Sequence, residues 1–463
     1  MHSQQIESPT PLSYWHEDAG VDSTPEHPLN GDLDVDVAIV GGGYTGLWTA
    51  YYLASADPTL RIAVLEKQYV GFGASGRNGG WASAIFPATL QKVAASSSRA
   101  EAVRMQQAMF ETVEEIGKVV VAEGIDCDFR AGGYVSVARN QAQWIRSQRE
   151  IDGWRAWGFG EEHARLLSAS EASARVGMSH TLGGTFTPHC AAVQPAKLVQ
   201  GLGEVVRSLG VRVFDATEVL EIHSGGLSTT RGKVRADVIV RATEGYTAQL
   251  QGARRELVPM YSLMVATAPL PEGVWQEIGL RDRETFSDKR HLRIYGQRTH
   301  DGRIAFGGRG APYHFGSRVK AEFDIDRRVH EMLRTILVDL FPVLQGVQFT
   351  HAWGGNLGIS RDWYPSVGYD RSSGLAHAGG YVGDGVATAN LAGRTLAAEI
   401  LDVDTDLRAL PWVNRNSPRW EPEPLRWIGV NAGTVAFNIA DRTEQRFGRP
   451  SRLASGLWRA LGH

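Results

Sequence analysis

Apolar and polar positions follow strand and helix periods in the first part of the chain. Residues 34–40 (DVDVAIV) form a short run rich in β-branched side chains, which predicts a buried parallel strand. Residues 47–55 then carry Leu and Ala at helical spacing, and residues 61–66 (RIAVLE) predict a second strand. Together they make a strand–helix–strand unit of about 30 residues, the size expected of a βαβ unit.

The middle of the chain changes to the pattern of an antiparallel sheet. Strands alternate over residues 259–308, and Asp301-Gly302 predicts a hairpin turn between strands 292–298 and 304–306. After residue 345 the βα pattern returns, with a strand over 375–380 and a helix over 386–401. The other elements we predict are helices over 99–123, 141–177 (with breaks), 196–209, 321–340 and 425–440, and strands over 129–138, 211–214, 217–222 and 234–243.

This order of elements predicts an α/β fold in which a sheet domain is inserted into a first domain. The segments that we expect are an N-terminal arm (1–33), three parts of the first domain (34–126, 186–254 and 346–405), two parts of the inserted domain (127–185 and 255–345) and a C-terminal tail (406–463).

Bulk composition narrows the possible partners. Apolar residues make up 43% of the 463 and charged residues 21%, which is ordinary for a protein with a sizeable core. The formal net charge of −3 gives no support to nucleic-acid binding. Two cysteines, Cys127 and Cys190, allow neither a disulfide framework nor a Cys-rich metal site, and we predict no metal. Without a secretory pattern or a membrane-spanning apolar run, we expect a cytoplasmic protein with no membrane partner.

A glycine motif follows the first predicted strand. Gly41, Gly43 and Gly46 fit the pattern GxGxxG at the start of a helix. Such glycines permit a tight turn, a close approach of backbone to a pyrophosphate, and packing of helix on strand. Glu66 ends the second strand, where a carboxylate can accept hydrogen bonds from ribose hydroxyls. The motif predicts a dinucleotide site and leaves NAD and FAD open.

Two later glycine-rich segments favour FAD. Residues 71–80 (GFGASGRNGG) offer backbone N–H groups together with Ser75, Arg77 and Asn78. Residues 379–385 (GGYVGDG) stand between a predicted strand and a predicted helix, so the start of that helix can face the flavin. Its dipole would stabilise the negative charge that a flavin gains on reduction.

In these segments the chain resembles the FAD-dependent D-amino-acid oxidase superfamily, and within it the γ-glutamylputrescine oxidoreductase, glycine oxidase and sarcosine oxidase group. The resemblance covers roughly residues 34–402. The segments that carry it are DVAIVGGGYTGL (36–47), LEKQYVGFGASGRNGG (65–80), VQPAKLVQGL (193–202), VIVRATEGYT (238–247), DGRIAFGGRG (301–310) and AGGYVGDGVATANLAGR (378–394).

The resemblance implies a two-domain flavoprotein with a Rossmann-like FAD-binding domain and an inserted antiparallel substrate sheet. It implies that FAD is held by residues of the glycine motif and second strand, of the second glycine-rich segment, of one later strand and of the last glycine turn. These are Gly41, Gly43, Tyr44, Thr45, Gly46, Glu66, Lys67, Ala74, Ser75, Arg77, Asn78, Gly79, Gly80, Val219, Gly380, Gly383, Asp384, Gly385 and Val386.

The chain departs from the family pattern at several positions. Some relatives attach flavin through a late Cys or a His near the second glycine segment, but residues 351–359 hold no Cys and residues 74–81 no His. We therefore expect non-covalent FAD. Glu244 stands where the family often has Asn, and Asp384 where it often has His, and both changes bear on redox tuning.

The resemblance implies oxidation of a carbon–nitrogen bond of an amine or amino acid, with O2 or another electron acceptor and with a homo-oligomer possible. The substrate-side candidates are Arg309, Trp353, Tyr381, Tyr261 and Tyr295. Arg309 could hold a substrate carboxylate or form a surface ion pair, and the aromatic residues could instead be ordinary core. Lys289 could act in oxygen activation, although a solvated lysine is the better interpretation.

Two other functions remain open from the sequence. An NAD-dependent dehydrogenase would bind no flavin, and a non-catalytic flavin subunit would bind flavin that no amine reduces. The tail helix predicted over 425–440 more readily caps the body or joins subunits than binds a membrane. The arginines after it, at 442, 446, 449 and 452, leave a helix lying on a membrane surface open.

Overall fold

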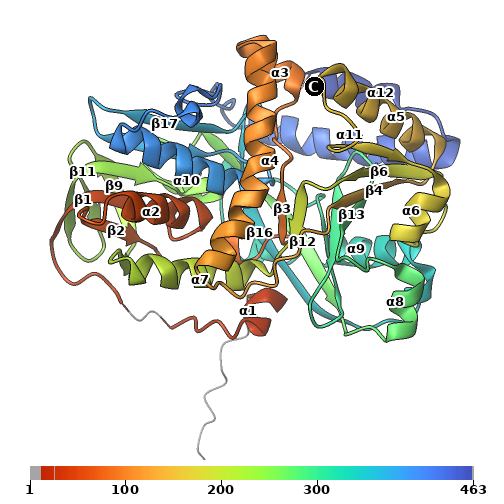
Figure 1. Cartoon of the computed structure of the whole chain (residues 1–463), viewed down its shortest axis with the longest axis horizontal. Helices are drawn as coiled ribbons and strands as arrows, with labels where there is room; N and C mark the ends of the chain where they lie inside the picture. Colours follow the sequence, from red (N-terminus) through yellow and green to blue (C-terminus); the bar gives the residue numbers. More distant parts are fainter. Residues whose placement is uncertain (1–11, 25–26, 461–463) are drawn as a thin grey trace, which may run out of the picture.

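The computed structural model describes residues 12–24 and 27–460 and has two lobes (Figure 1). One lobe contains the first sheet with α2 and α10, and the other contains the second sheet with α8, α9 and the C-terminal α11 and α12. The long helix α4 (Arg99–Ala122) runs across the long axis of the molecule, between the lobes in the view of Figure 1.

The first sheet has eight strands, and the predicted βαβ unit lies at its centre. Its main order is β17-β18-β11-β1-β2-β8, and a β9–β10 hairpin is attached to β11. β1 pairs in parallel with β11 and β2, and β11 with β18. The strand bounds are β1 Leu33–Val40, β2 Ile62–Leu65, β8 Arg212–Phe214, β9 Val219–His223, β10 Gly226–Thr229, β11 Lys233–Arg241, β17 Ser366–Asp370 and β18 Leu375–Gly379.

Both faces of this sheet are buried. Val37 and Ile39 point into the large core that the helices share, while Ala38 and Val40 point to the core under the β9–β10 hairpin. The helices are α2 (Tyr44–Ala56), α7 (Pro195–Ser208) and α10 (Gly385–Leu401). α2 and α10 cross closely, because a Cβ at Gly393 would lie 2.7 Å from the Trp48 carbonyl carbon.

The second sheet also has eight strands, in the order β16-β12-β15-β14-β13-β4-β6-β5. Every pairing is antiparallel except β13–β4, which is parallel. The hairpin predicted around Asp301-Gly302 joins β14 to β15. The bounds are β4 Tyr134–Ala138, β5 Arg165–Leu167, β6 Gly183–Thr187, β12 Leu257–Thr267, β13 Thr285–Asp288, β14 Ile294–Arg298, β15 Ile304–Gly308 and β16 Phe349–Ser360.

β16 crosses the predicted division of the chain. The sequence assigned residues 346–405 to the first domain, yet β16 pairs along its length with β12 in the second sheet. The segment 129–138, predicted as strands around a Gly-Gly turn, contains an isolated bridge from Arg130 to Ala192 before the glycines and β4 from Tyr134 after them. The remaining segment boundaries stay a prediction.

The helix predicted over 321–340 begins later than expected. Residues Ala321–Asp324 form a short 3-10 turn, and α9 runs over Arg327–Leu340. The Asp326 side chain accepts hydrogen bonds from the backbone N–H groups of Arg328 and Val329, so it caps a new helix. The other helices are α3 Leu90–Ser96, α5 Gln141–Ala156, α6 Ala169–Arg175 and α8 Glu272–Ile278, and β3 (Trp81–Ser83) pairs with β7 (Cys190–Ala192) in a separate ribbon.

The N-terminal arm docks onto the body through α1 (Tyr14–Asp18). Trp15 is fully buried, and its Nε1 donates to the Asn78 carbonyl oxygen at 2.9 Å. The Trp15 ring meets Trp353 edge to face, and the Gln194 amide donates to the Trp15 carbonyl oxygen. The arm therefore covers the second glycine-rich segment.

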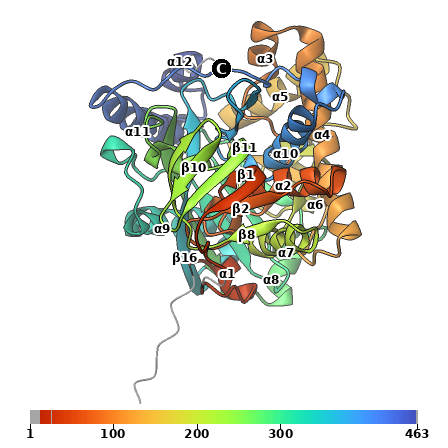
Figure 2. The same cartoon turned by 90° about the vertical axis from the view of Figure 1, so that its left-hand side faces the viewer.

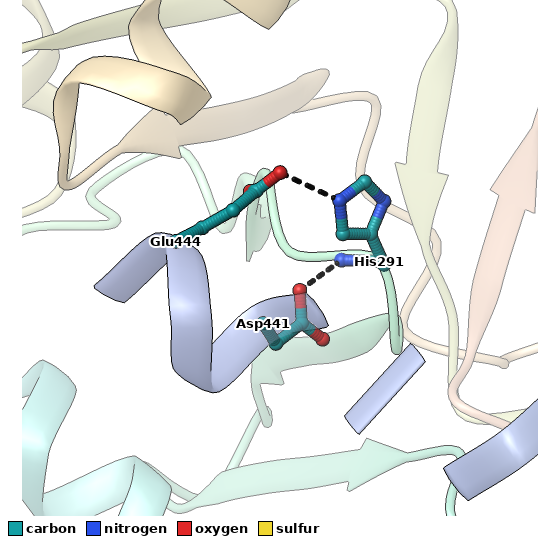
Figure 3. Close-up of side chains that lie close together, drawn as sticks. All are labelled: His291, Asp441 and Glu444. Carbon is teal, nitrogen blue, oxygen red and sulfur yellow. Dashed lines mark hydrogen bonds and ion pairs between the residues drawn. The ribbon is translucent and has the colours of Figure 1, made fainter. Parts of the chain in front are cut away.

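The tail forms α11 (Leu425–Phe447) and α12 (Arg452–Ala460) and is anchored on the second lobe. Asp441 accepts from the backbone N–H groups of His291 and Leu292, and Glu444 pairs with the His291 ring at 2.9 Å (Figure 3). Glu444 also accepts from Arg146.

His291, Asp441 and Glu444 are near enough to hold a metal ion, the one such group in the described part of the chain. However, Trp458 Nε1 donates to His291 Nδ1, and both carboxylates already accept hydrogen bonds from the protein. We therefore interpret this group as an anchor for the tail, and it is called the tail anchor below.

Candidate functional site

The glycine turn after β1 has no room for side chains. A Cβ at Gly46 would lie 2.0 Å from the Gly41 carbonyl oxygen, and one at Gly41 would lie 2.6 Å from the Ala242 carbonyl oxygen. Gly41 also has φ +111°, which L side chains rarely adopt. Gly43 is the N-cap residue of α2 and makes no side-chain cap, so the helix N-terminus is left to backbone donors. This is the geometry that receives a phosphate group.

Glu66 lies beside that turn at the end of β2. Its carboxylate accepts from the Gly42 N–H at 2.8 Å and from the Gln68 N–H at 2.9 Å. Burial raises the pKa of Glu66 above its usual range. Val219 begins β9 close by, because the Thr217 N–H donates to the Glu66 carbonyl oxygen. Lys67 is different: it is exposed, and its ammonium pairs with Glu218 at 2.6 Å.

The second glycine-rich segment folds against the first. Ser75 Oγ accepts from the Tyr44 N–H at 2.9 Å, so it occupies the first turn of α2. Ala74 and Ser75 belong to a 3-10 turn over Ala74–Gly76. The Asn78 side chain closes the segment on itself, since it donates to the carbonyl oxygens of Ala74 and Ser75 and accepts from the Gly80 N–H.

Arg77 is buried and already has charged and polar partners. Its guanidinium pairs with Asp324 at 2.8 Å and donates to the Tyr246 hydroxyl at 3.2 Å. It also lies over the Phe72 ring, 5.2 Å from the centroid. Arg77 therefore links this segment to the second lobe, and its carbonyl oxygen accepts from Trp353 Nε1 at 2.9 Å.

Gly79 and Gly80 lie directly against the second sheet. A Cβ at Gly79 would lie 2.7 Å from the Tyr295 ring, and one at Gly80 would lie 2.0 Å from Gln297 Nε2. Gln297 donates to the carbonyl oxygens of Gly79, Gly80 and Val193, which are all on the first-lobe side. We call this junction of residues 74–80 and 379–385 with β12, β14, β15 and β16 the seam.

Buried polar atoms at the seam fit a bound polar cofactor. Gln297 Oε1 and both amide atoms of Asn356 are buried without a protein partner. Burying such groups unpaired is costly, so each needs a donor or acceptor that a cofactor can supply. Asn356 lies opposite Tyr261 in the β16–β12 pair. Its Oδ1 would lie 3.0 Å from a Cβ at Gly245. Together with the glycine turn, these atoms fit FAD.

The last glycine turn leads into α10 and is held from the first sheet. Gly380 and Gly383 have positive φ angles of 76° and 101°. The Glu244 carboxylate accepts from the N–H groups of Gly380 and Tyr381, both at 3.1 Å. Burial raises the pKa of Glu244 to about 7, so its proton is exchanged near neutral pH.

The residues around the start of α10 range from partly exposed Asp384 to buried Val386. Asp384 is the N-cap residue but makes no side-chain cap, and burial raises its pKa. Val386 is buried in the core that α10 shares with α2. Tyr381 is 2% exposed, and its hydroxyl lies 2.9 Å from Thr45 Oγ1 of α2. Tyr381 thus ties Thr45 to this turn.

The substrate-side candidates divide into two groups. Arg309, at the end of β15, donates to the Val382 carbonyl oxygen, and a Cβ at Gly383 would lie 3.1 Å from its guanidinium. Arg309 therefore contacts the last glycine turn and does not form the surface ion pair that the sequence left open. Tyr295 is partly buried, its hydroxyl lies 2.7 Å from Ser262 Oγ, and its ring meets Trp81. Both residues reach the seam.

Trp353 and Tyr261 have structural partners. Trp353 is 1% exposed between Trp15 and the Arg77 carbonyl. Tyr261 is 3% exposed, and its hydroxyl exchanges hydrogen bonds with the backbone of Lys320. Its ring packs on Phe323. The sequence left open that the aromatic candidates are ordinary core residues. The burial and the partners of Trp353 and Tyr261 fit that alternative.

Lys289 differs from the expectation of a solvated lysine. It is 8% exposed, and its ammonium pairs with Glu150 at 2.5 Å and contacts Thr185 Oγ1 at 2.8 Å. Glu150 belongs to α5 and Thr185 to β6, at the far end of the second sheet from β16. The structure therefore assigns Lys289 a buried ion pair away from the seam.

Sequence reasoning missed Gln297 and Asn356 as site residues, and it noted Glu244 only as a departure from the family pattern. A polar side chain within a strand is usually interpreted as solvent-facing. The only sequence signal was Glu244, which departs from the family pattern at a position with positive φ. Gln297 and Asn356 gave no signal because their burial depends on the first lobe lying over them.

Comparisons with known proteins agree with this geometry. The family model described as FAD dependent oxidoreductase matches residues 36–399. The chain is 30% identical to γ-glutamylputrescine oxidoreductase from Escherichia coli over 82% of this chain and 87% of that protein. It is 31% identical to a probable oxidoreductase OrdL from Rhizobium meliloti, over 87% and 92%.

A solved structure shares the fold. Glycine oxidase from Geobacillus kaustophilus superposes with a TM-score of 0.67 at 23% identity, over 83% of this chain and 99% of that one. Among the described residues, we find no helix long and apolar enough to cross a membrane.

Proposed function

The chain belongs to the family of FAD-dependent oxidoreductases, and from this premise we propose that it oxidises a carbon–nitrogen bond of an amine or amino acid. The family makes the protein an FAD enzyme, so the NAD-dependent and non-catalytic alternatives are set aside. The relatives with assigned names include a γ-glutamylputrescine oxidoreductase and a glycine oxidase, whose substrates contain amines.

One observation carries the proposal: a partly buried cation and an aromatic ring of the second sheet meet the cofactor-side glycines. Tyr295 packs against Gly79, and Arg309 reaches the turn at Val382 and Gly383. A substrate at the seam would therefore lie between a cation, an aromatic ring and the turn that precedes α10.

We propose that residues of the first lobe hold FAD. The glycine turn would receive the pyrophosphate, Glu66 the ribose and the backbone at Val219 the adenine. Ser75, Asn78, Gly79 and Gly80 would lie along the flavin, opposite the turn over residues 380–386. Arg77 and Lys67 have protein partners, so we assign Arg77 an orienting role and give Lys67 none.

Bound FAD would supply the electron acceptor, taking a hydride from the carbon next to nitrogen at N5 and later passing two electrons to O2 or another acceptor. The oxidised substrate is an imine, which water hydrolyses. The protein must make the substrate amine neutral, because an ammonium cannot release hydride readily. For a Lys-like pKa of about 10.4, deprotonation at pH 7 costs roughly 4–5 kcal/mol.

Arg309 and Tyr295 lower that cost. The partly buried Arg309 guanidinium repels an ammonium and favours the neutral amine, and a ring that excludes water has the same effect. Arg309 has five N–H donors, of which Val382 takes one among the described contacts, so a substrate carboxylate can be bound by the others.

The test is an anaerobic absorption spectrum of the purified holoenzyme with a panel of amines. We expect an oxidised-flavin spectrum that is bleached by one class of amine and not by its N-acetylated form, whose amide nitrogen has no available lone pair. A bound flavin that no amine bleaches would contradict the proposal.

We further propose that FAD is bound non-covalently. Cys127 and Cys190 are buried, and Cys190 Sγ already contacts Thr285 Oγ1 at 3.3 Å. Precipitation with acid should release all of the yellow chromophore into the supernatant. Colour that stays in the protein pellet would show a covalent bond.

A further inference from the structure

The outward face of α11 is apolar over most of its length. Leu425, Ile428, Val435 and Ile439 are 61%, 52%, 57% and 51% exposed. Their spacing of three, seven and four residues places them on one side of a helix, together with Ala432. Monomeric soluble proteins rarely expose contiguous large apolar side chains of this kind, so the face has a partner.

The opposite face fixes this orientation. Arg426, Phe437, Ala440 and Glu444 are the buried residues of α11. The tail anchor holds Glu444 to His291 and Arg146, and Phe437 packs on Trp458 of α12. The helix therefore cannot rotate to bury its outward face, and α11 itself lies at the outer edge of the molecule (Figure 2).

The end of the tail is cationic on its exposed surface. Arg442, Arg446, Arg449 and Arg452 are all exposed. The acids between residues 425 and 460 are Asp441 and Glu444, and both are turned inward into the tail anchor. No ion pair of these four arginines occurs within residues 12–24 and 27–460. The exposed tail therefore presents apolar side chains and positive charge without exposed acids.

A second copy of this chain would fit the face poorly. In a parallel helix pair the arginines would face each other, and in an antiparallel pair they would face the apolar half of the partner helix. The two carboxylates that precede α11 in the sequence are already paired, Glu421 with Arg361 and Glu423 with Arg426. Charge complementarity therefore favours an anionic partner rather than the same helix.

We propose that α11 and the start of α12 bind the surface of an anionic phospholipid bilayer, with α11 lying in the plane of the interface. Apolar side chains would enter the acyl boundary while the arginines contact lipid phosphates, as in interfacial amphipathic helices. Trp427 and Phe447, 42% and 63% exposed, add aromatic area at the two ends of α11.

A cavity at the N-terminal end of α11 extends this surface. Its volume is about 540 Å³, and its lining includes Phe315, Arg318, Trp427 and Ile428. Phe315 is 48% exposed, so the apolar surface continues from the helix onto the 312–318 loop. The cavity combines apolar walls with a cation, which suits a lipid headgroup and the first part of its chain.

The experiment is co-sedimentation of the full-length holoenzyme with vesicles of phosphatidylcholine alone or with 30% phosphatidylglycerol. We expect binding to the anionic vesicles, little binding to the neutral ones, and release in 0.5 M NaCl through screening. The combined change Arg442→Ser, Arg446→Ser and Arg449→Ser should weaken binding on the order of 100-fold, at roughly fivefold for each arginine.

Apolar variants separate a membrane from other partners. Val435→Asp with Ile439→Asp should abolish vesicle binding, and the matched control Val121→Asp, an exposed apolar residue of α4, should not. An unchanged flavin spectrum and melting temperature would show that each variant is folded. Absent binding of the wild-type chain to anionic vesicles would overturn the proposal.

Two further outcomes would also overturn it. Equal binding by Val435→Asp with Ile439→Asp would show that another surface contacts the lipid. A wild-type dimer in solution that these substitutions dissociate, without vesicle binding, would show that a second copy covers α11. Neither result would touch the proposed amine oxidation, which the anaerobic spectrum tests independently.

Discussion

The proposed cofactor side, made of the glycine turn after β1 and the first-lobe part of the seam, consists mainly of backbone, whereas the substrate side consists of side chains. On the cofactor side, Gly41, Gly46 and Gly80 leave no space for a Cβ. On the substrate side, Arg309 and Tyr295 project from a regular sheet. Backbone geometry tolerates few residue types, but a side chain on a strand can be exchanged without changing the strand. The cofactor side should therefore be sensitive to any substitution, and the substrate side only to the chemistry of the group replaced.

The largest effect that would sharpen this comparison is expected from Gly46→Ala. The added methyl would collide with the Gly41 carbonyl oxygen at 2.0 Å and force the turn open. We expect a protein purified without flavin, with FAD affinity lowered at least 100-fold, measured by absorbance and by fluorescence titration. The control is Gly153→Ala in α5, where a Cβ meets nothing within 4 Å, and which should bind FAD normally.

The second effect lies on the substrate side. Arg309→Met should leave the FAD content unchanged and lower kcat/KM for a carboxylate-bearing amine by about 30- to 100-fold, the value of a charge-assisted hydrogen bond. Amines without a carboxylate should lose less. Steady-state kinetics on both substrates checks this, with the exposed Arg281→Met as control. Loss of flavin from Arg309→Met would contradict the claim that the substrate side does not contribute to FAD binding.

A smaller effect concerns Glu244, which holds the turn at Gly380 and Tyr381 on the cofactor side. Its folded-state pKa is raised to about 7 from an ordinary 4.5, so the folded protein prefers the protonated carboxyl. Its stabilising effect is therefore complete below about pH 4.5 and is lost as the pH rises to 7.

In the wild type, Glu244 makes the free energy of unfolding fall as the pH rises from about 4.5 to 7. Glu244→Gln should remove about 2 kcal/mol of that fall. Thermal melts of the holoenzyme between pH 5 and 8 measure it, with the exposed Glu221→Gln on β9 as control. A wild-type stability that rises over this range relative to Glu244→Gln would contradict the assigned pKa direction.

The smallest effect is expected at the tail anchor, outside both sides of the seam. Burial alone would raise the pKa of Glu444, but hydrogen bonds from His291, the Ser451 N–H and Arg146 lower it to about 2. Its contribution is thus present above about pH 4.5 and is lost as the pH falls to 2.

Glu444→Gln should destabilise the tail at neutral pH by about 1 kcal/mol and leave FAD bound. Faster amide hydrogen exchange confined to α11 and α12 would be the readout, with Gln445→Ala as the neighbouring control. Global unfolding or lost flavin in Glu444→Gln would mean that the tail supports the seam as well.

The sequence was sufficient where local pattern and local structure agree. β1, α2 and β2 follow from apolar periodicity and the glycine motif, and the hairpin at Asp301-Gly302 follows from its turn residues. β16 was missed because Gly354 and Gly358 interrupt its pattern. A Cβ at Gly354 would lie 2.3 Å from Leu263, so glycine there reflects close packing and not a loop.

The candidate site was predicted unevenly for the same reason. The cofactor glycines can be identified in the sequence because their spacing is fixed by one turn. Gln297 and Asn356 cannot, because only the approach of the first lobe buries them. The surroundings of Lys67 and Lys289 could not be predicted either, because each ammonium pairs with a carboxylate from a distant segment.

The parallel pairing of β11 with both β1 and β18 has a consequence for synthesis of the chain. A growing polypeptide leaves the ribosome from its N-terminus. After the glycine turn at residue 41 has emerged, β11 follows only nearly 200 residues later, and β18 and α10 more than 330 residues later. Flavin capture must therefore be a late event, and a polypeptide truncated before residue 375 would lack a complete cofactor site.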